Sequence, residues 1–299
     1  ASRAKRLPGV SPSAQTLGIT KHRMATTNLG NELNRIVREA RGSMFDQGEL
    51  AQLTYGAFDI AASSMHESQD EEIQVTFPIG YKPDKTAIPT TRTYRKEQLL
   101  SKYQYLAFHQ LTVNALVHLV TLVETMLGDV VRTVVRRYPQ KLSGKRNLSI
   151  QAILESTSLE EVHIRATDAL LNELAYKSPA EFAESIEPLL SVNLLECPAF
   201  HRYIEVKATR DIFIHNRGIA NDVYVRKAGS HARVNSGMAL PADINYFLES
   251  YEHCLQVADW LETELHNHWH SSEYEDRKNP QIEIPLTEEP ETGGVPDAE

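Results

Sequence analysis

Two side chains near residue 210 have the types that phosphodiester chemistry needs. Arg210 and His215 lie close together in the stretch T-R-D-I-F-I-H-N, with Asp211 directly after the arginine and Asn216 directly after the histidine. A guanidinium stays charged and presents a planar fork of donors that matches phosphate oxygens. An imidazole titrates near neutral pH and can move protons. The pair therefore indicates a site for a phosphate-containing substrate.

These residues are predicted to lie near the C-terminal end of one helix. Pro198 favours a helix start because its missing N–H costs little there, and Gly218 marks the end. Five residues at about 100° each place Arg210 and His215 roughly 140° apart around an ideal helix. One straight helix would not direct both at a single phosphate. We therefore expect either a distortion at the helix end or a two-fold partner that supplies a second pair.

The same residues resemble the signature of HEPN domains, in which an arginine and an adjacent polar residue are followed by a histidine. Gly218 and Tyr224 follow in the matching order, and the stretch L-V-H-L-V-T-L-V-E-T-M-L-G-D-V-V-R resembles the first long helix of the branch related to RNase-L-type ribonucleases. The resemblance covers residues 98–270. It implies a homodimeric, metal-independent endoribonuclease that uses no cofactor and leaves a 2′,3′-cyclic phosphate. Such domains often act as toxins or effectors in bacterial conflict systems.

Carried over by position, the resemblance assigns roles to four residues. Arg210 and His215 become the catalytic pair, Asp211 fills the polar position, and Glu124 lies where an acid often supports the site; Asn216 is a further supporting residue. The chemistry agrees with this assignment, because RNA carries its own nucleophile in the 2′-hydroxyl. The protein then has to move protons and to stabilise a charge-rich phosphorus centre.

Basic residues cluster in two stretches and predict contact with RNA. Residues 130–146 contain six Lys or Arg and no acid, and residues 202–233 contain seven Lys or Arg against three acids. Cations at a helix C-terminus are also favoured by the helix dipole alone, which is the alternative explanation. The expected RNA contacts are Arg132, Arg136, Arg137, Lys141, Lys145, Arg146, Lys207, Arg217 and Tyr224.

Composition is ordinary for a globular protein of 299 residues, with 41% hydrophobic and 24% charged residues. Its two cysteines, Cys197 and Cys254, argue against a secreted disulfide scaffold and favour the cytosol. The longest apolar tract, 111–131, contains Glu124 and Asp129, so we interpret it as a core helix rather than a membrane span. A cytoplasmic location without a membrane partner is therefore expected.

Charge divides the chain unevenly. The net charge is −9, yet nine acids against two cations in 271–299 leave only −2 for the rest, so a polyanionic ligand is not excluded. We predict a basic disordered arm at 1–27, a helical extension and linker at 28–94, a helical domain at 95–270 and an acidic disordered tail at 271–299.

Hydrophobic periodicity predicts an all-α fold, an antiparallel helical bundle of HEPN type. Apolar residues step by three and four through 95–137, 158–176 and 241–269, and short connections favour antiparallel neighbours. Two shorter helical patterns before residue 67 predict a short N-terminal extension. The β-branched and aromatic run at 223–237 predicts a small β or turn insertion before the last helix.

Two other functions fit the same sequence. The first is a catalytically silent relative that binds a nucleotide or RNA, or serves as a scaffold in a multi-protein complex. The second is a toxin held by a cognate antitoxin, with the acidic tail or the basic arm as the interaction element. The presence of both Arg210 and His215 favours the active enzyme, because a silent module has no need of the histidine.

Overall fold

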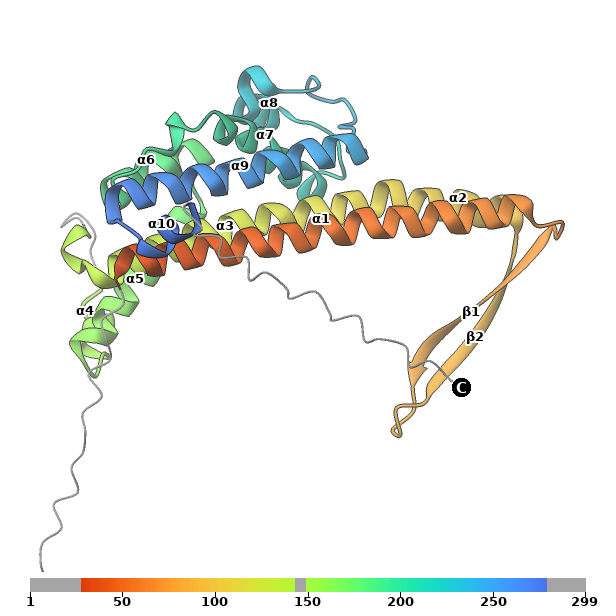
Figure 1. Ribbon diagram of the computed structural model, residues 1–299, viewed down its shortest axis with the longest axis horizontal. Coiled ribbons are helices and arrows are strands. Elements are labelled where there is room, and N and C mark those ends of the chain that lie inside the picture. Colours follow the sequence, from red (N-terminus) through yellow and green to blue (C-terminus); the bar gives the residue numbers. More distant parts are fainter. Residues whose placement is uncertain (1–27, 143–148, 279–299) are drawn as a thin grey trace, which may run out of the picture.

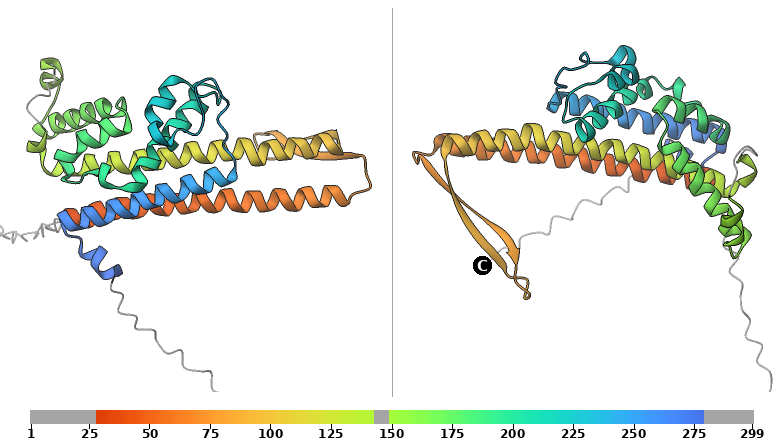
Figure 2. Two further views of the ribbon diagram at one scale, coloured as in Figure 1. Left: turned by 90° about the horizontal axis from the view of Figure 1, so that it is seen from above. Right: turned by 180° about the vertical axis from the view of Figure 1, so that it is seen from behind.

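The computed structural model describes residues 28–142 and 149–278, and it is mostly helical (Figure 1). Two long antiparallel rods lie side by side in every view (Figures 1 and 2). The first rod is a single helix, and the second consists of three consecutive segments that include a π-helical turn. Their bounds are α1 (Leu29–Glu67), α2 (Lys96–Tyr105), η1 (Leu106–Leu111) and α3 (Thr112–Arg137).

A β-hairpin joins the two rods and stands away from the helices (Figure 1). Strands β1 (Glu72–Tyr81) and β2 (Ala87–Arg95) pair in antiparallel register from Glu72–Arg95 to Tyr81–Ala87. Their turn is closed by the Lys82 N–H, which donates to the Thr86 carbonyl at 2.9 Å. The strands form because I-Q-V-T-F alternates polar and apolar residues, the period that suits a strand.

The last long helix, α9 (Ile244–Trp269), packs against α1, α3 and α7. Two glycines of α1 allow this close approach. A Cβ added to Gly30 would lie 2.5 Å from the carbonyl oxygens of Trp269 and His270, and one added to Gly48 would lie 2.8 Å from the Tyr251 ring. Larger residues at either position would force α1 and α9 apart.

Shorter helices cover the other side of α3. Helices α5 and α6 form one pair there, α7 follows through η3, and α8 is a single short helix after the end of α7. The remaining bounds are η2 (Pro139–Lys141), α4 (Ile150–Leu154), α5 (Leu159–Ala175), α6 (Pro179–Leu190), η3 (Leu194–Glu196), α7 (Pro198–His215), α8 (Asp222–Ala228), η4 (Gly229–His231) and α10 (Ser272–Lys278).

One large apolar core lies between these layers. It joins Leu33 and Met44 of α1, the inward face of α3, Phe200 of α7, and Phe247 and Leu261 of α9. A smaller cluster under α8 contains Ile212, Tyr224 and Leu240. Because α1 contributes to the main core, residues 29–67 are part of the folded body.

The all-α prediction is confirmed at the level of helical content, and two of its details are wrong. The N-terminal extension at 28–94 is not a short appendage, because α1 is one 39-residue helix in the core. The predicted β or turn insertion at 223–237 is instead α8 followed by η4, and the paired strands lie at 72–95. Asn221 explains the helix, since its side chain accepts from the Tyr224 N–H at 2.9 Å and caps the first turn. The predicted disordered tail at 271–299 is wrong at its start, because Ser272–Lys278 form α10, where Arg277 contacts Asn34 of α1 and Glu262 of α9. The rest of the tail, from 279 onward, and the predicted arm at 1–27 lie outside the described residues.

The rod Lys96–Arg137 is, by length and composition alone, the one helix of the described residues that is long and apolar enough to cross a membrane. Its α3 part packs against α1 and α9 and buries residues from Ala115 to Val135 in the core. A core helix passes the same test of length and composition, so the finding is weak evidence for a membrane span.

Candidate functional site

Helix α7 carries the predicted catalytic residues and has the predicted start and end. Pro198 is its first residue and His215 its last. The chain then turns sharply, with Arg217 at φ 54° and Gly218 at φ 77°, and the Gly218 N–H donates back to the Ile212 carbonyl at 3.2 Å. This turn satisfies carbonyls at the helix end and leaves His215 exposed at the C-terminus of α7.

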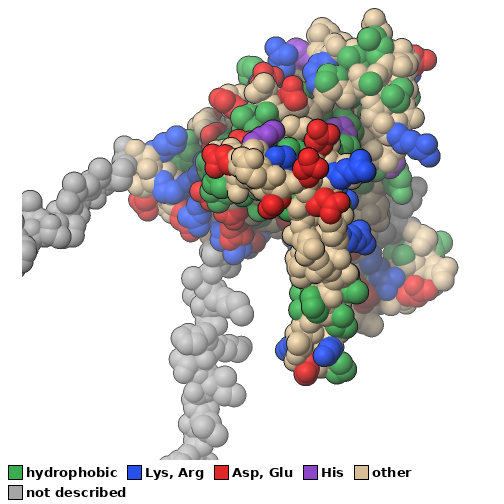
Figure 3. Space-filling model, turned by 90° about the vertical axis from the view of Figure 1, so that its right-hand side faces the viewer, with side chains coloured by type: hydrophobic (Ala, Val, Ile, Leu, Met, Phe, Trp, Pro, Cys, Tyr) green, Lys and Arg blue, Asp and Glu red, His purple; other side chains and the backbone are tan. Residues whose placement is uncertain are grey.

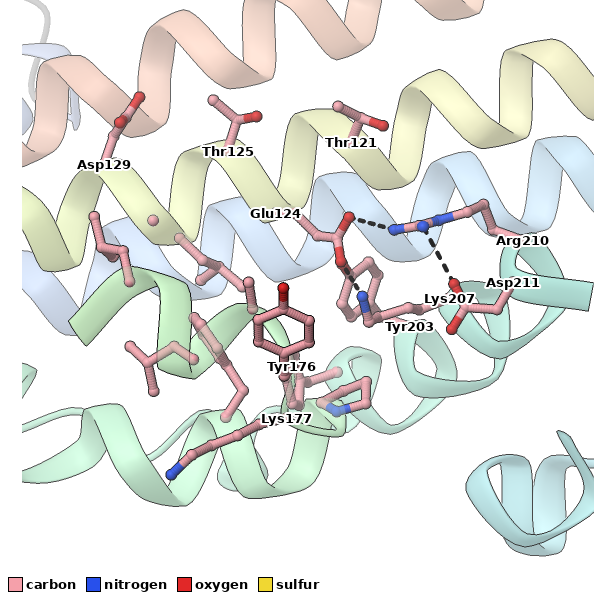
Figure 4. A pocket seen from close by; sticks show the side chains of 18 of the residues that line it. Thr121, Glu124, Thr125, Asp129, Tyr176, Lys177, Tyr203, Lys207, Arg210 and Asp211 are labelled. Atoms are coloured by element: carbon pink, nitrogen blue, oxygen red, sulfur yellow. Dashed lines mark hydrogen bonds and ion pairs between the residues drawn. The ribbon is translucent and has the colours of Figure 1, made fainter. Parts of the chain in front are cut away.

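A cavity of about 710 Å³ lies between α3, the α5–α6 corner and α7, and Lys227 of α8 also lines it. Figure 4 shows this cavity from close by, with side chains of α3 and α7 on one side and those of the α5–α6 corner on the other. The lining residues include Glu124, Arg210, Asp211 and His215. Four residues that the sequence singles out, separated by as many as 91 positions, thus share one cavity.

Helix geometry explains how Arg210 and His215 reach the same cavity. On a wheel of about 100° per residue that starts at Arg210, Lys207 lies near 60°, Asp211 near 100° and His215 near 140°. Each of these residues lines the cavity. The cavity therefore faces the middle of the 140° arc that these four residues span on the helix surface. Arg210 and His215 lie at the two edges of that arc. The distortion or second subunit that the sequence suggested is not required to bring them to one space.

An ion-pair network holds the arginine. Both carboxylate oxygens of Glu124 are engaged, one by Lys207 Nζ and the other by Arg210 Nη2 (Figure 4). Arg210 Nη1 lies 3.2 Å from Asp211 Oδ1, and Lys227 Nζ lies 3.4 Å from the other Asp211 oxygen. The Arg210 and Lys207 side chains are only 17% and 15% exposed, so the two acids compensate cations that are largely removed from water.

Two buried polar atoms of this network lack a hydrogen-bond partner among the described residues: Arg210 Nε and the Tyr203 hydroxyl. Burial raises the pKa of Tyr203 well above its usual value, and the negative charge of Glu124 adds to the effect. The Tyr203 phenol is therefore neutral. Unpaired buried donors are rare in folded proteins, and here both belong to residues that line the cavity.

The two supporting residues that follow in the sequence have different roles. Asp211 joins the charge network, as described above. Asn216 instead follows the last residue of α7, and its side-chain amide donates to the Ile219 carbonyl. Asn216 therefore stabilises the turn that places His215. No hydrogen bond or ion pair joins the His215 imidazole to another residue in 28–142 or 149–278.

The predicted RNA contacts are scattered. Arg132 and Lys207 line the cavity, and each is paired with an acid, Asp129 and Glu124 respectively. Arg136 and Arg137 are exposed at the far end of α3, and Arg217 is exposed in the turn after α7. Lys141 donates to the Leu189 carbonyl at 2.8 Å and lies over the Trp269 ring. Lys145 and Arg146 lie outside the described residues.

Tyr224 corrects one of these predictions. It is buried, its hydroxyl donates to Glu205 Oε1 at 2.8 Å and accepts from the Arg233 N–H at 3.0 Å, and it packs in the cluster under α8. Its ring is therefore not available for stacking on a base. A tyrosine at this position looks the same in sequence whether it faces solvent or the interior, and the packing of α8 on α7 decided the outcome.

Several residues of the cavity are not among the residues predicted from the sequence. Lys227 and the aromatic residues of the α5–α6 corner line the cavity beside Lys207, which the sequence predicts as an RNA contact, and Tyr203, which it predicts as a stacking surface. For α7 a signal existed, because Phe200, Tyr203, Lys207 and Arg210 repeat at the spacing of three and four that marks one helix face. For the corner no local signal exists, since its position depends on how α5 and α6 pack on α3.

In the part of the chain that the structure describes, no three His, Cys, Asp or Glu side chains are grouped so that they could hold a metal ion. Comparison of the chain with protein-family models, with curated proteins and with solved structures finds no match. What this protein does must therefore be inferred from the cavity and the residues that line it.

Proposed function

We propose that this protein is a metal-independent endoribonuclease of the HEPN type, with its active site in the cavity between α3 and α7. The observation that carries the proposal is the convergence of Arg210, His215 and Glu124 on one cavity. Five Lys or Arg and three Asp or Glu line this cavity, which leaves an excess of positive charge for a phosphate.

The reaction that fits these groups is transesterification within RNA. The 2′-oxygen attacks the adjacent phosphorus and gives its proton to the His215 imidazole. The O2′–P bond forms, the P–O5′ bond breaks, and the 5′-oxygen leaves with a proton from an imidazolium. The products are a 2′,3′-cyclic phosphate and a 5′-hydroxyl. Arg210 and Lys207 supply fixed positive charge to the phosphoryl oxygens as negative charge develops.

Two proton transfers on opposite sides of one phosphate favour two imidazoles, so we propose a homodimer with a composite site. Large apolar residues are exposed along the distal half of α1, where Leu53 and Ile60 are 73% and 74% exposed, and along η1 at Leu106 and Phe108. The neighbouring His109 ring contacts Phe213 of α7 at a centroid distance of 6.3 Å. A second subunit on this surface would therefore lie near the end of α7 that carries His215.

The experiment is cleavage of labelled tRNA and mRNA by the purified protein in EDTA. Arg210→Ala and His215→Ala should each reduce the rate by about 10²-fold or more, the usual contribution of a proton-transfer group or of a preorganised charge. Two matched controls, Arg226→Ala and His201→Ala, remove exposed side chains of the same types outside the cavity and should leave the rate unchanged. A requirement for Mg²⁺, or equal activity of all four variants, would overturn the proposal.

The catalytically silent RNA- or nucleotide-binding module is the alternative, and one observation favours it. Both Nη atoms of Arg210 are already occupied by Glu124 and Asp211, so a phosphate has to displace or share a carboxylate. Binding of RNA without cleavage in the same assay would support this function.

The biological role that we propose is a toxin or defence effector, acting alone or released from an antitoxin or defence-complex partner in the cytoplasm. This proposal rests on the resemblance described above. Expression of the wild type should slow bacterial growth, and His215→Ala should relieve the effect. Equal toxicity of the two would argue against a nuclease toxin.

A further inference from the structure

The cavity has two chemically different halves. One half contains the charged and titratable groups Lys207, Arg210, Asp211, His215 and Lys227. The other half is lined mainly by Leu127, Leu171, Leu174, Phe182 and Phe200. Its charged residues, Asp129, Arg132 and Lys177, are ion-paired, Arg132 with Asp129 and Lys177 with Glu173. In the view of Figure 4, Tyr176 lies between the charged network around Glu124 and Arg210 and Lys177 of the α5–α6 corner. A phosphate bound by Lys207 and Arg210 occupies only the first half, which leaves the apolar half without an occupant.

Gly128 keeps the floor of the apolar half open. This glycine lies inside α3 and lines the cavity, and a Cβ built on it would meet no heavy atom within 4 Å. Glycine inside a helix is less stable than alanine, so a residue that weakens the helix fills this position and leaves space in the cavity.

An aromatic ring stands at the rim of this half. Tyr176 ends α5, lines the cavity and is 93% exposed, which is unusual for a side chain of its size. Exposed aromatic rings beside a basic groove are the common platform on which proteins stack the bases of single-stranded nucleic acids. The volume of about 710 Å³ lies within the range of ordinary small-molecule sites.

We propose that the apolar half is a nucleobase subsite, in which one base lies over Gly128 and stacks on Tyr176 while its phosphate is held by Lys207 and Arg210. A nucleotide matches both halves of the cavity, because it joins a charged phosphate group and a flat apolar ring in one molecule. The inference rests on the proposed function for its source of ligand, an unpaired nucleotide of the RNA beside the cleaved phosphate. A free nucleotide has the same chemistry and is the other possible source.

The first test is calorimetric titration of the 299-residue chain with adenosine 5′-monophosphate, uridine 5′-monophosphate and ribose 5-phosphate. At least one nucleotide should bind about tenfold more tightly than ribose 5-phosphate, which carries the phosphate without a base, because base stacking on an aromatic side chain contributes that much or more. Equal affinity for all three compounds would overturn the subsite.

Two variants locate the base. Gly128→Leu should fill the apolar half and Tyr176→Ala should remove the platform, and each should abolish the preference for a nucleotide over ribose 5-phosphate. Their controls are Gly56→Leu, at an exposed helical glycine whose added Cβ also meets nothing, and Tyr81→Ala, at an exposed tyrosine of the hairpin. If circular dichroism shows that Gly128→Leu does not fold, the test of the subsite uses Tyr176→Ala alone. Retention of the preference in Tyr176→Ala would then overturn the proposal.

Cleavage of RNAs that differ only in the bases flanking one cut site separates this inference from the proposed function. A base preference that disappears in Tyr176→Ala identifies RNA as the source of the base. Cleavage with no preference, and no effect of Tyr176→Ala, rejects the subsite while the nuclease stands. Nucleotide binding without any RNA cleavage supports the subsite with a free nucleotide as its ligand and rejects the nuclease.

Discussion

Glu124 of α3 and Arg210 of α7 form an ion pair between residues 86 positions apart in the chain. The same carboxylate binds Lys207, so one acid holds two cations that are largely removed from water. This relationship makes Glu124 both a structural link between two helices and the group that orients the arginine of the candidate site.

Replacement of Glu124 by glutamine should weaken the link between α3 and α7 and loosen the orientation of Arg210. Glu124→Gln removes the charge that compensates Arg210 and Lys207, and we expect the free energy of unfolding to fall by about 1–2 kcal/mol, since the carboxylate is partly exposed and solvent screens the loss. Urea denaturation measures this change. The matched control is Glu184→Gln, an exposed acid of α6, and a loss of similar size there would show that the network at Glu124 has no special weight.

The largest loss of stability is expected at Glu205, which is buried. Its Oε1 accepts from Tyr224 at 2.8 Å and from Arg233 Nε at 3.0 Å, and its Oε2 accepts from Tyr246 at 2.8 Å. Glu205→Gln places an amide donor among groups that also donate and leaves the Arg233 charge uncompensated. The free energy of unfolding should fall by about 3 kcal/mol, the usual result when one partner of a buried ion pair is removed.

An exposed glutamate of α9 controls for the chemistry of that change. Glu252 is exposed and accepts from Gln256 one turn away at 3.1 Å. Glu252→Gln should therefore change stability by no more than about 0.5 kcal/mol. Equal destabilisation by Glu205→Gln and Glu252→Gln in thermal or urea unfolding would mean that the buried network contributes little.

Alkaline pH should unfold the protein through its buried tyrosines. Burial raises the pKa of Tyr203, Tyr224 and Tyr246 above the value of about 10 that tyrosine has when unfolded. The folded state thus holds these phenolic protons more tightly than the unfolded state does. The resulting stabilisation is fully present below pH 10 or so, and it is lost as pH rises toward the raised pKa values.

Phenolate absorbance measured against pH, together with circular dichroism, tests this expectation. Of the twelve tyrosines, Tyr203, Tyr224 and Tyr246 should ionise only with the loss of helical signal. A single titration step that is complete while the helices persist would contradict the burial of these rings.

The proposed dimer predicts a change in mass from two surface substitutions. Leu53→Asp and Ile60→Asp place charges on the exposed apolar residues of α1 and should convert a dimer into a monomer, because an interface core excludes unpaired charge. Size-exclusion chromatography with light scattering gives the mass. Gln52→Asp, at a neighbouring exposed polar position, should leave the dimer intact. A wild type that is already monomeric at high concentration would rule out the composite site.

The face of the molecule at the hairpin end is not uniformly basic (Figure 3). Seen from the hairpin end, acidic and basic side chains are interspersed, and the β-hairpin stands away from the helices (Figure 3). Arg136 and Arg137 are separated from Glu124 by twelve or more residues of α3, which is roughly 18 Å along the helix. RNA contact outside the cavity is therefore expected to depend on local clusters.

Local signals in the sequence are enough to predict α7, and the chemistry that they favour at its end stays a prediction. Pro198 and Gly218 mark its start and its terminal turn, and the types of Arg210, Asp211 and His215 indicate a phosphate site, because capping, periodicity and side-chain chemistry depend on a few neighbouring residues. The same reasoning placed α3 and α9 by their apolar stripes. The prediction that Glu124 supports the site came instead from the resemblance to HEPN domains alone.

Only the tertiary structure decided which of these residues meet. The sequence did not show that α1 is a single core helix, that Tyr224 is buried, or that Glu124 binds Lys207 as well as Arg210. Each of these facts depends on the packing of helices that are distant in the chain. Side chains separated by more than 80 positions leave no periodic pattern for their pairing, and the contact exists only once the helices have associated.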